Sequence, residues 1–318
     1  MKKTITTVAV AALATLPVTP ASALGSAFTC DSVTYQVVGA QLKIGEVDKS
    51  KSPPKLTYTD VGSANSSSYN AGGYNTVDNF IYAVESGVHL LKIASDGSVE
   101  RSSGTITGLD SSHFFAAGDV SADGESLITI DNTAKSVWSV DLDTVVATNI
   151  GSMPPAPSSV AIGDFAIVQS GGSTMAYGFD TTTGALVSFD PTENPIDVQV
   201  NSDVEVGAGS AKGAVWADSS GDLTTFVNST GDVYLVKDPG SASPSVKKVA
   251  EGSAAAGNDG MKCALADSAF PPPSGSSGNS EKLAYTGASM PVVVLSSVLG
   301  ILVLMAGAAV RFPRRDRS

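Results

Sequence analysis

Short segments with β-strand patterning recur through the middle of this 318-residue chain, at a spacing of about 40 to 50 residues. Between them no long run has helical periodicity, and alternating apolar runs are separated by Gly, Asp, Asn and Ser. Each unit consists of a strand, a turn, a second strand that often ends in Asp, another turn and a third strand. The units begin near Tyr35, Asn79, Glu125, Asp164 and Asp222. This spacing is typical of propeller blades, so the sequence predicts an all-β propeller of about five blades.

The looseness of the repeat keeps a β-sandwich of similar strand content as the alternative fold. Asp-Gly pairs mark turns between the strands, because Asp bonds the local backbone and Gly accepts a positive φ. These pairs are Asp96-Gly97, Asp123-Gly124 and Asp259-Gly260. We therefore expect most aspartates of the repeat region to serve turns.

The N-terminus has the three parts of a secretory signal. Two lysines precede an apolar stretch over residues 5–16, and small residues follow a helix-breaking proline. Ala21 and Ala23 occupy the positions at which signal peptidase needs small side chains, which predicts a signal peptide over residues 1–23 with cleavage after Ala23. The alternative, a retained membrane anchor, needs a longer apolar run.

The C-terminus carries a second apolar segment. Residues 290–310 have no charge, and as a helix they would span about 31 Å, the thickness of a bilayer core. Four arginines follow within residues 311–318. The positive-inside rule holds such a tail on the cytoplasmic side. The sequence therefore predicts a transmembrane helix over residues 290–310, a basic cytoplasmic tail over residues 311–318, and the bulk of the chain outside the cell.

A pentapeptide stands just ahead of this apolar run, formed by Leu283, Ala284, Tyr285, Thr286 and Gly287. It resembles the LPxTG sorting signal with Ala in the Pro position, and the LAxTG form is associated with class E sortases of high-GC Gram-positive bacteria. The resemblance implies that a sortase thiol attacks the carbonyl of Thr286 and passes the chain to an amine of peptidoglycan. A permanent single-pass anchor and a GPI-type lipid-anchor signal are the alternatives. We expect a secreted protein that reaches the cell wall through a membrane-inserted precursor.

The segments between these ends differ in composition. Residues 267–282 contain three consecutive prolines followed mostly by Ser and Gly, and they are interpreted as a linker behind an ectodomain over residues 28–266. Without its terminal segments the chain keeps 13 basic and 30 acidic residues, a net charge of about −17. Such a surface repels nucleic acid and anionic lipid, so neither is expected as a partner.

The two cysteines of the chain, Cys30 and Cys263, flank the repeat region. Oxidation is permitted in an exported protein, which predicts a disulfide that closes the ring of blades. Two free thiols are the alternative. A metal site is the weaker alternative, because only His89 and His113 could join the two thiols.

Several motifs of the ectodomain are similar to those of a known family. They are Phe28-Thr-Cys-Asp, Tyr69-Asn-Ala-Gly-Gly-Tyr-Asn, Asp78-Asn-Phe-Ile-Tyr-Ala, Ala117-Gly-Asp, Ala122-Asp-Gly and Asn258-Asp-Gly-Met-Lys-Cys. On these motifs the region resembles a propeller-like domain of unknown function in secreted and wall-anchored proteins of actinobacteria. The resemblance covers nearly the whole ectodomain and implies a fold but no activity.

The sequence offers little for catalysis. His89 lies in a strand-like run and His113 precedes two phenylalanines, so both are interpreted as packed or strand-surface histidines. No Gly-x-Ser-x-Gly, His-Glu-x-x-His or Cys-x-x-Cys pattern occurs. The segment between Asp218 and Asp222 comes closest to a calcium loop but lacks its alternating ligands. We predict no catalytic residue, no metal and no cofactor.

Three functional hypotheses remain. The leading one is a non-enzymatic binding or interaction ectodomain that contacts an unidentified extracellular ligand through loops at one end of the propeller channel. The second is a surface carbohydrate-active hydrolase or lyase with two carboxylates about 5 to 10 Å apart in the channel mouth. The third is a structural wall protein without a specific ligand.

Overall fold

The computed structural model describes residues 23–154, 159–170 and 172–270, and their regular structure consists of twenty β-strands. In chain order the strands are β1 (Thr34–Val38), β2 (Gln41–Asp48), β3 (Lys55–Asp60), β4 (Tyr69–Tyr74), β5 (Ile81–Glu85), β6 (His89–Ile93), β7 (Val99–Arg101), β8 (Phe115–Val120), β9 (Ser126–Asp131), β10 (Ser136–Asp141), β11 (Val146–Ser152), β12 (Ile162–Ser170), β13 (Ser173–Asp180), β14 (Ala185–Phe189), β15 (Gln199–Glu205), β16 (Lys212–Ala217), β17 (Leu223–Val227), β18 (Asp232–Lys237), β19 (Ser245–Glu251) and β20 (Asn258–Lys262).

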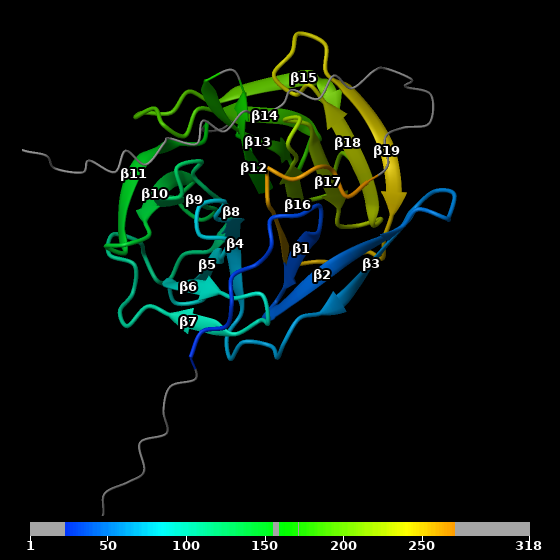
Figure 1. The fold of residues 1–318 in the computed structure, drawn as a ribbon. Coiled ribbons are helices and arrows are strands. Elements are labelled where there is room, and N and C mark those ends of the chain that lie inside the picture. The colour runs from blue at the N-terminus through cyan, green and yellow to red at the C-terminus, as the bar shows by residue number, and fades with distance from the viewer. Residues whose placement is uncertain (1–22, 155–158, 171, 271–318) are drawn as a thin grey trace, which may run out of the picture. The chain divides into compact units, whose positions relative to one another are not determined.

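These strands form five antiparallel blades of four strands each. Blade I contains β4–β7, blade II β8–β11, blade III β12–β15 and blade IV β16–β19. Blade V combines the N-terminal strands β1–β3 with the C-terminal strand β20, which pairs with β1. The innermost strands contact one another in a closed cycle from β4 through β8, β12, β16 and β20 back to β4, and Figure 1 shows them around the centre of the ring. The predicted five-bladed propeller is confirmed, and the sandwich alternative is set aside.

The hydrophobic core is divided among the blade interfaces. Each of five buried clusters lies between two neighbouring blades, as between blades II and III, where Ile130 and Val137 meet Phe165 and Phe189. All five clusters, the twenty strands and the disulfide lie between Phe28 and Phe270. The propeller therefore contains within itself the packing that a domain needs to fold.

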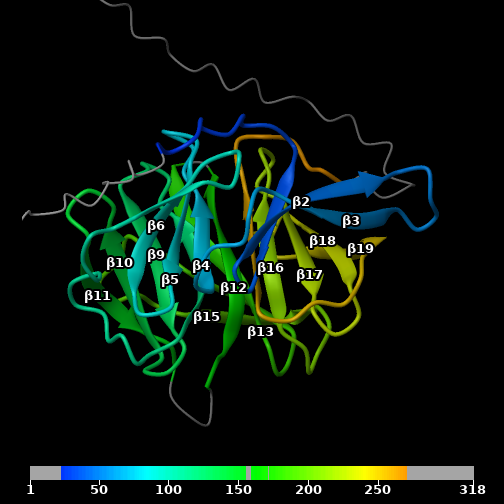
Figure 2. The same ribbon diagram turned by 90° about the horizontal axis from the view of Figure 1, so that it is seen from below.

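The innermost strands contain residues that are unusual in strands. Glycine occurs in all five, and at Gly118 a Cβ atom would lie 2.5 Å from the carbonyl oxygen of Ala71 on the neighbouring blade. The backbones of adjacent blades can approach this closely because glycine has no side chain. Four of these strands, β4, β8, β12 and β16, also carry a bulge against the second strand of their blade. Figure 2 shows β4, β12 and β16 running between the two loop faces of the ring.

Two details of the predicted repeat are wrong. Its units follow the second, third and fourth strands of blades I and II, but the unit that begins at Asp164 starts on the innermost strand β12. The Asp259-Gly260 pair lies inside β20 and forms no turn, whereas Gly97 and Gly124 have φ values of 80° and 77° and do form turns. Both predictions are wrong because the inner strands contain Asp and Gly, which are depleted in ordinary strands.

The packed chain also extends past the predicted ectodomain boundary at residue 266. Phe270 is 4% exposed and its ring centroid lies 6.1 Å from that of Trp216. None of the described segments contains a helix that could cross a membrane. The predicted signal peptide up to residue 22, the rest of the linker, the sorting motif, the transmembrane run and the basic tail lie outside the described residues.

Candidate functional site

A cavity of about 330 Å³ opens between blades I and II, on the face where the innermost strands begin. Its walls come from the first residues of β4 and β8, the β5–β6 turn, the segment ahead of β8 and Gly257, which directly precedes β20. This size is at the lower end of the ~300–1,000 Å³ range of small-ligand sites. The cavity is the candidate site of the propeller.

Two consecutive phenylalanines of the cavity wall face different surroundings. Phe115, the first residue of β8, is 5% exposed and packs into the core between blades I and II. Phe114, directly ahead of the strand, is 57% exposed and lines the cavity. Few large apolar side chains of the described chain are this exposed, so the ring of Phe114 is available for contact with a ligand.

His113 lines the same cavity and is held by an aspartate. Its Nδ1 lies 2.6 Å from Oδ2 of Asp131, and its Nε2 lies 3.6 Å from Oδ2 of Asp110. Oδ1 of Asp131 in turn accepts the backbone N–H groups of Thr133 and Ala134. The hydrogen bond to Asp131 raises the pKa of His113 above its usual value. His113 lies in a loop and is half-buried, so the prediction of a strand-surface position is wrong for it. His89 is half-buried and is the first residue of strand β6, as predicted.

The buried carboxylate of an ion pair forms another part of the wall. The side chain of Glu85, 2% exposed, accepts a hydrogen bond from Nε of Arg101 and one of 3.0 Å from Nδ2 of Asn65. Each carboxylate oxygen thus has a donor, and the guanidinium compensates the charge of Glu85.

The polar groups of the wall include one that lacks a partner. Asn70 on β4 is 8% exposed, and its Oδ1 is buried with no hydrogen-bond donor among the described residues. Beside it in the cavity lining, the hydroxyl groups of Ser68 and Ser86 bond each other at 2.8 Å. A buried amide oxygen without a donor costs folding free energy.

Three aspartates lie on innermost strands and link the blades near the axis. Asp119 of β8 accepts the backbone N–H of Ile167 on β12 at 2.8 Å. Asp164 of β12 accepts those of Val215 on β16 and Gly260 on β20, at 2.6 Å and 3.1 Å. The remaining aspartate, Asp259 of β20, accepts that of Gly72 on β4. We name these residues, Asp119, Asp164 and Asp259, the axial carboxylates.

Burial and mutual repulsion raise the pKa values of the axial carboxylates. Desolvation raises the pKa of Asp119 to about 7 and lifts the pKa of Asp164 well above its usual range. For Asp259, desolvation is followed by repulsion from Asp164 in raising the pKa. Asp164 and Asp259 raise each other's cost of ionisation, and Oδ1 of Asp259 has no hydrogen-bond partner among the described residues. A proton on one of the two carboxyl groups removes their repulsion and can supply a hydrogen bond between them.

The axial carboxylates therefore have a structural role, because they accept hydrogen bonds from backbone N–H groups of neighbouring blades. Both Asp164 and Asp259 are 0% exposed, and Asp164 is saturated by backbone N–H donors. The sequence pattern marks Asp119 only as part of a family motif and predicts a turn at Asp259. Their role became recognisable from the strand arrangement, which brings residues 140 positions apart to one axis.

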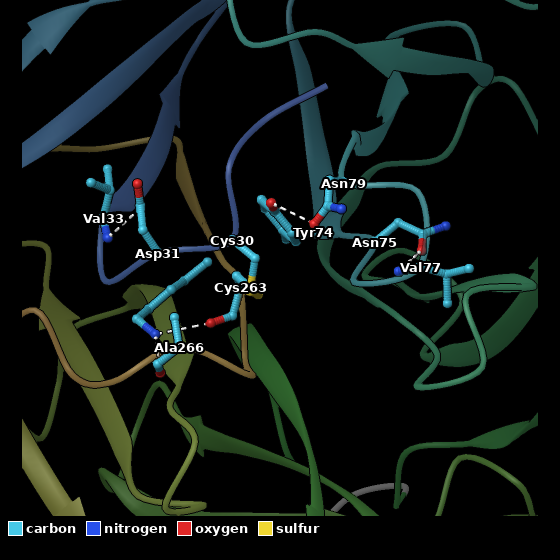
Figure 3. Close-up of a disulfide and its surroundings, with 10 residues drawn as sticks. Cys30, Asp31, Val33, Tyr74, Asn75, Val77, Asn79, Cys263 and Ala266 are labelled. Carbon is cyan, nitrogen blue, oxygen red and sulfur yellow. Dashed lines mark hydrogen bonds between the residues drawn. A yellow bond between two sulfur atoms is a disulfide. The ribbon is translucent and has the colours of Figure 1, made fainter. Parts of the chain in front are cut away.

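Cys30 and Cys263 form the predicted disulfide, with their Cα atoms 5.3 Å apart. Figure 3 shows the bond beside the entry to β1, where Asp31 accepts the backbone N–H of Val33. Cys263 directly follows β20, so the bond reinforces the strand pair that closes the ring. Next to it the ammonium of Lys262 donates to the carbonyl groups of Cys263 and Ala266, and burial lowers the pKa of Lys262 to about 8.

The described chain offers no assembled metal centre, since no group of three or more His, Cys, Asp and Glu side chains in it could hold an ion. Oδ1 of Asp218, in the segment compared with a calcium loop, accepts the backbone N–H of Ser220 at 2.9 Å. That segment is a turn. Of the predicted processing residues, Ala23 is exposed at the start of the described chain, and Ala21 and residues 283–287 lie outside it.

Comparisons with known proteins give a family match and solved structures of low sequence identity. A family model described as a repeat of unknown function (DUF6923) matches residues 33–265. Among functionally curated proteins, none has a significantly similar sequence.

Solved structures with similar folds share little sequence with this chain. A protein of unknown function from Bacteroides thetaiotaomicron is 10% identical with a TM-score of 0.46, over 69% of this chain and 57% of that one. Virginiamycin B lyase from Staphylococcus aureus is 10% identical with a TM-score of 0.40, over 67% and 68%. The β-propeller domain of Cps50 (Swd1) from Myceliophteria thermophila is 10% identical with a TM-score of 0.37, over 69% and 87%. At these identities the likeness concerns the fold alone.

Proposed function

We propose that this chain, which belongs to the DUF6923 repeat family, is a cell-wall-anchored surface protein whose propeller is a non-enzymatic binding module. Export is supported by the signal sequence and by a disulfide, which persists in oxidising surroundings outside the cytoplasm. Anchoring is supported by the order of pentapeptide, apolar run and arginines. The partners that follow are a sortase, class E by its motif, and peptidoglycan.

One observation carries the binding part of this proposal. The propeller has an open cavity with an exposed aromatic ring on a loop face, while Asp164 and Asp259 are buried and hydrogen-bonded. A hydrolase or lyase of the predicted kind needs two carboxylates that reach a substrate. Asp164 and Asp259 link blades, so the arrangement favours recognition over turnover.

The experiment separates binding from catalysis. The propeller is incubated with an array of glycans and matrix proteins, and the same glycans are analysed by mass spectrometry for shortened or unsaturated products after prolonged incubation. The proposal expects specific capture without product. Product formation that is lost in a His113→Asn variant would replace the binding module with an enzyme that uses the histidine of the cavity. Absence of both capture and product would leave a structural wall protein.

A further inference from the structure

We infer that the cavity between blades I and II binds an uncharged saccharide, with a sugar ring on Phe114 and a sugar O–H or N–H group donated to Asn70. This inference rests on the proposed binding function and adds the class of ligand. Four features of the wall carry it: paired charges, an exposed aromatic ring, an unsatisfied acceptor, and the size of the space.

The charges of the wall are compensated within the protein. Glu85 is bonded to Arg101 and Asn65, and His113 is bonded to Asp131. Among the described residues that line the cavity none is a lysine or arginine. An anionic ligand would meet no uncompensated cation there, and the whole chain carries a net charge of −12. An ammonium ligand would compete with Arg101 for a carboxylate that already has two donors. The wall thus suits a neutral molecule.

The uncompensated groups of the wall are of two kinds. Phe114 offers an aromatic face with 57% of its surface exposed. Ser68, Ser86 and Asn70 offer hydroxyl groups and an amide oxygen. A sugar ring combines an apolar C–H face with a periphery of O–H groups, so one molecule can cover the ring of Phe114. The same molecule supplies the hydrogen-bond donor that Asn70 lacks once the amide of Asn70 turns its buried oxygen toward the cavity. A purely apolar ligand would leave Oδ1 of Asn70 unsatisfied.

The size of the cavity limits the ligand. At about 330 Å³ it suits one or two sugar rings and is too small for a folded segment of protein. The opening lies on a loop face, so a longer glycan could extend into solvent from a terminal ring held in the cavity. We expect recognition of a glycan end.

Binding is measured by calorimetry and by NMR titration with a fragment of residues 24–276, which contains the described propeller. The neutral probes are chitotriose, maltotriose and mannotriose; sialyllactose is the anionic probe and spermidine the cationic one. At least one neutral probe is expected to bind, and Phe114→Ala is expected to weaken that binding at least ten-fold. Asn70→Leu, which removes the acceptor at similar volume, should weaken it similarly. Val77→Ala is the matched control, because Val77 is 66% exposed and does not line the cavity.

The outcomes separate this inference from the proposed function. Failure of all neutral probes, or neutral-probe binding that Phe114→Ala leaves unchanged, overturns the saccharide assignment. Because Phe114 is exposed, its variant tests the inference even if Asn70→Leu lowers the melting temperature. Binding of sialyllactose, spermidine or an arrayed protein instead would keep the binding module and reject the uncharged saccharide. Cleavage of a neutral probe would reject the non-enzymatic function and keep the ligand class.

Discussion

The axial carboxylates govern how the propeller responds to pH. Their pKa values are raised by burial, and the pair Asp164 and Asp259 cannot both be charged without strong repulsion. Aspartates of the unfolded chain titrate near 3.9. Between about pH 4 and 7 the folded protein therefore holds more protons than the unfolded chain, and its stability falls as pH rises through this window.

We predict a higher melting temperature at pH 5 than at pH 7.5. The raised pKa of His113 acts in the same direction, since its contribution is lost as pH rises through the folded pKa. The lowered pKa values of Asp96, Asp110 and Asp141 act oppositely, but only below about pH 4. Scanning calorimetry across pH 4.5 to 7.5 measures the effect.

The variant Asp259→Asn tests whether the axial carboxylates cause this pH dependence of stability. An amide can donate to Asp164 and accept from Gly72 as the protonated carboxyl does, so the slope between pH 5 and 7.5 should flatten. Asp259→Ala should instead cost about 1–3 kcal/mol, because it leaves buried partners unsatisfied. Asp203→Asn, on the exposed side of β15, is the control. A melting temperature that rises with pH in the wild-type protein would contradict protonation of the axial carboxylates in the folded state.

At the level of elements, the outer strands are predictable from sequence, whereas of the inner strands only β12 has a recognisable strand pattern. β9 and β10 have the apolar alternation and the Asp-terminated end that define a strand pattern. β4 and β20 contain glycine and asparagine, and β20 also contains Asp259, which sequence propensity assigns to turns. These segments form strands because the ring packs the blades together. Small residues let neighbouring blades approach, and buried aspartates accept hydrogen bonds from the next blade. Local pattern does not contain that information.

The candidate site illustrates the same limit. His113 and Phe114 are visible in sequence as a polar residue beside aromatics, a pattern that also fits a packed strand. The contact with Asp131 depends on the β8–β9 pairing, and the cavity depends on the neighbouring blade. Neither can be inferred from spacing alone.

We predict that Gly118→Ala destabilises the propeller by about 1–3 kcal/mol or more, because the added methyl group would clash with backbone atoms that cannot move aside easily. Its Cβ would lie 2.5 Å from the carbonyl oxygen of Ala71. The matched control is Gly104→Ala, since a Cβ there meets nothing within 4 Å. Urea denaturation of both variants measures the difference. Equal stability of the two variants would contradict close contact between blades I and II at the axis.

The disulfide should contribute to stability through ring closure. It links residues 233 positions apart, and in the chain-entropy model such a loop implies roughly 5 kcal/mol as an upper figure. Cys30→Ser with Cys263→Ser should therefore lower the urea midpoint by a large step while β20 still pairs with β1. Non-reducing peptide mapping of the wild-type protein should yield one linked pair. Alkylation of both cysteines in native protein would contradict closure by this bond.

In the whole molecule, a closed propeller lies between two predicted processing signals. The disulfide lies where β1 and β20 pair to close the ring, and the cavity opens on a loop face. The export and sorting signals are linear motifs that enzymes recognise in extended chain, so the sequence alone predicts them. The proposed ligand would contact residues from several loops, and for that reason no linear motif identifies it.

The most direct test of wall anchoring is the state of the C-terminus in cells. Wall and membrane fractions of cells that express the full chain are extracted with hot detergent and then with muramidase, and the released protein is analysed by peptide mass spectrometry. We predict release by muramidase alone, a last peptide that ends at Thr286 with a cell-wall fragment attached, and retention of the uncut chain in the membrane for a Thr286→Ala variant. Detergent extraction of wild-type protein that still contains Arg317 would contradict wall anchoring and indicate a single-pass membrane protein.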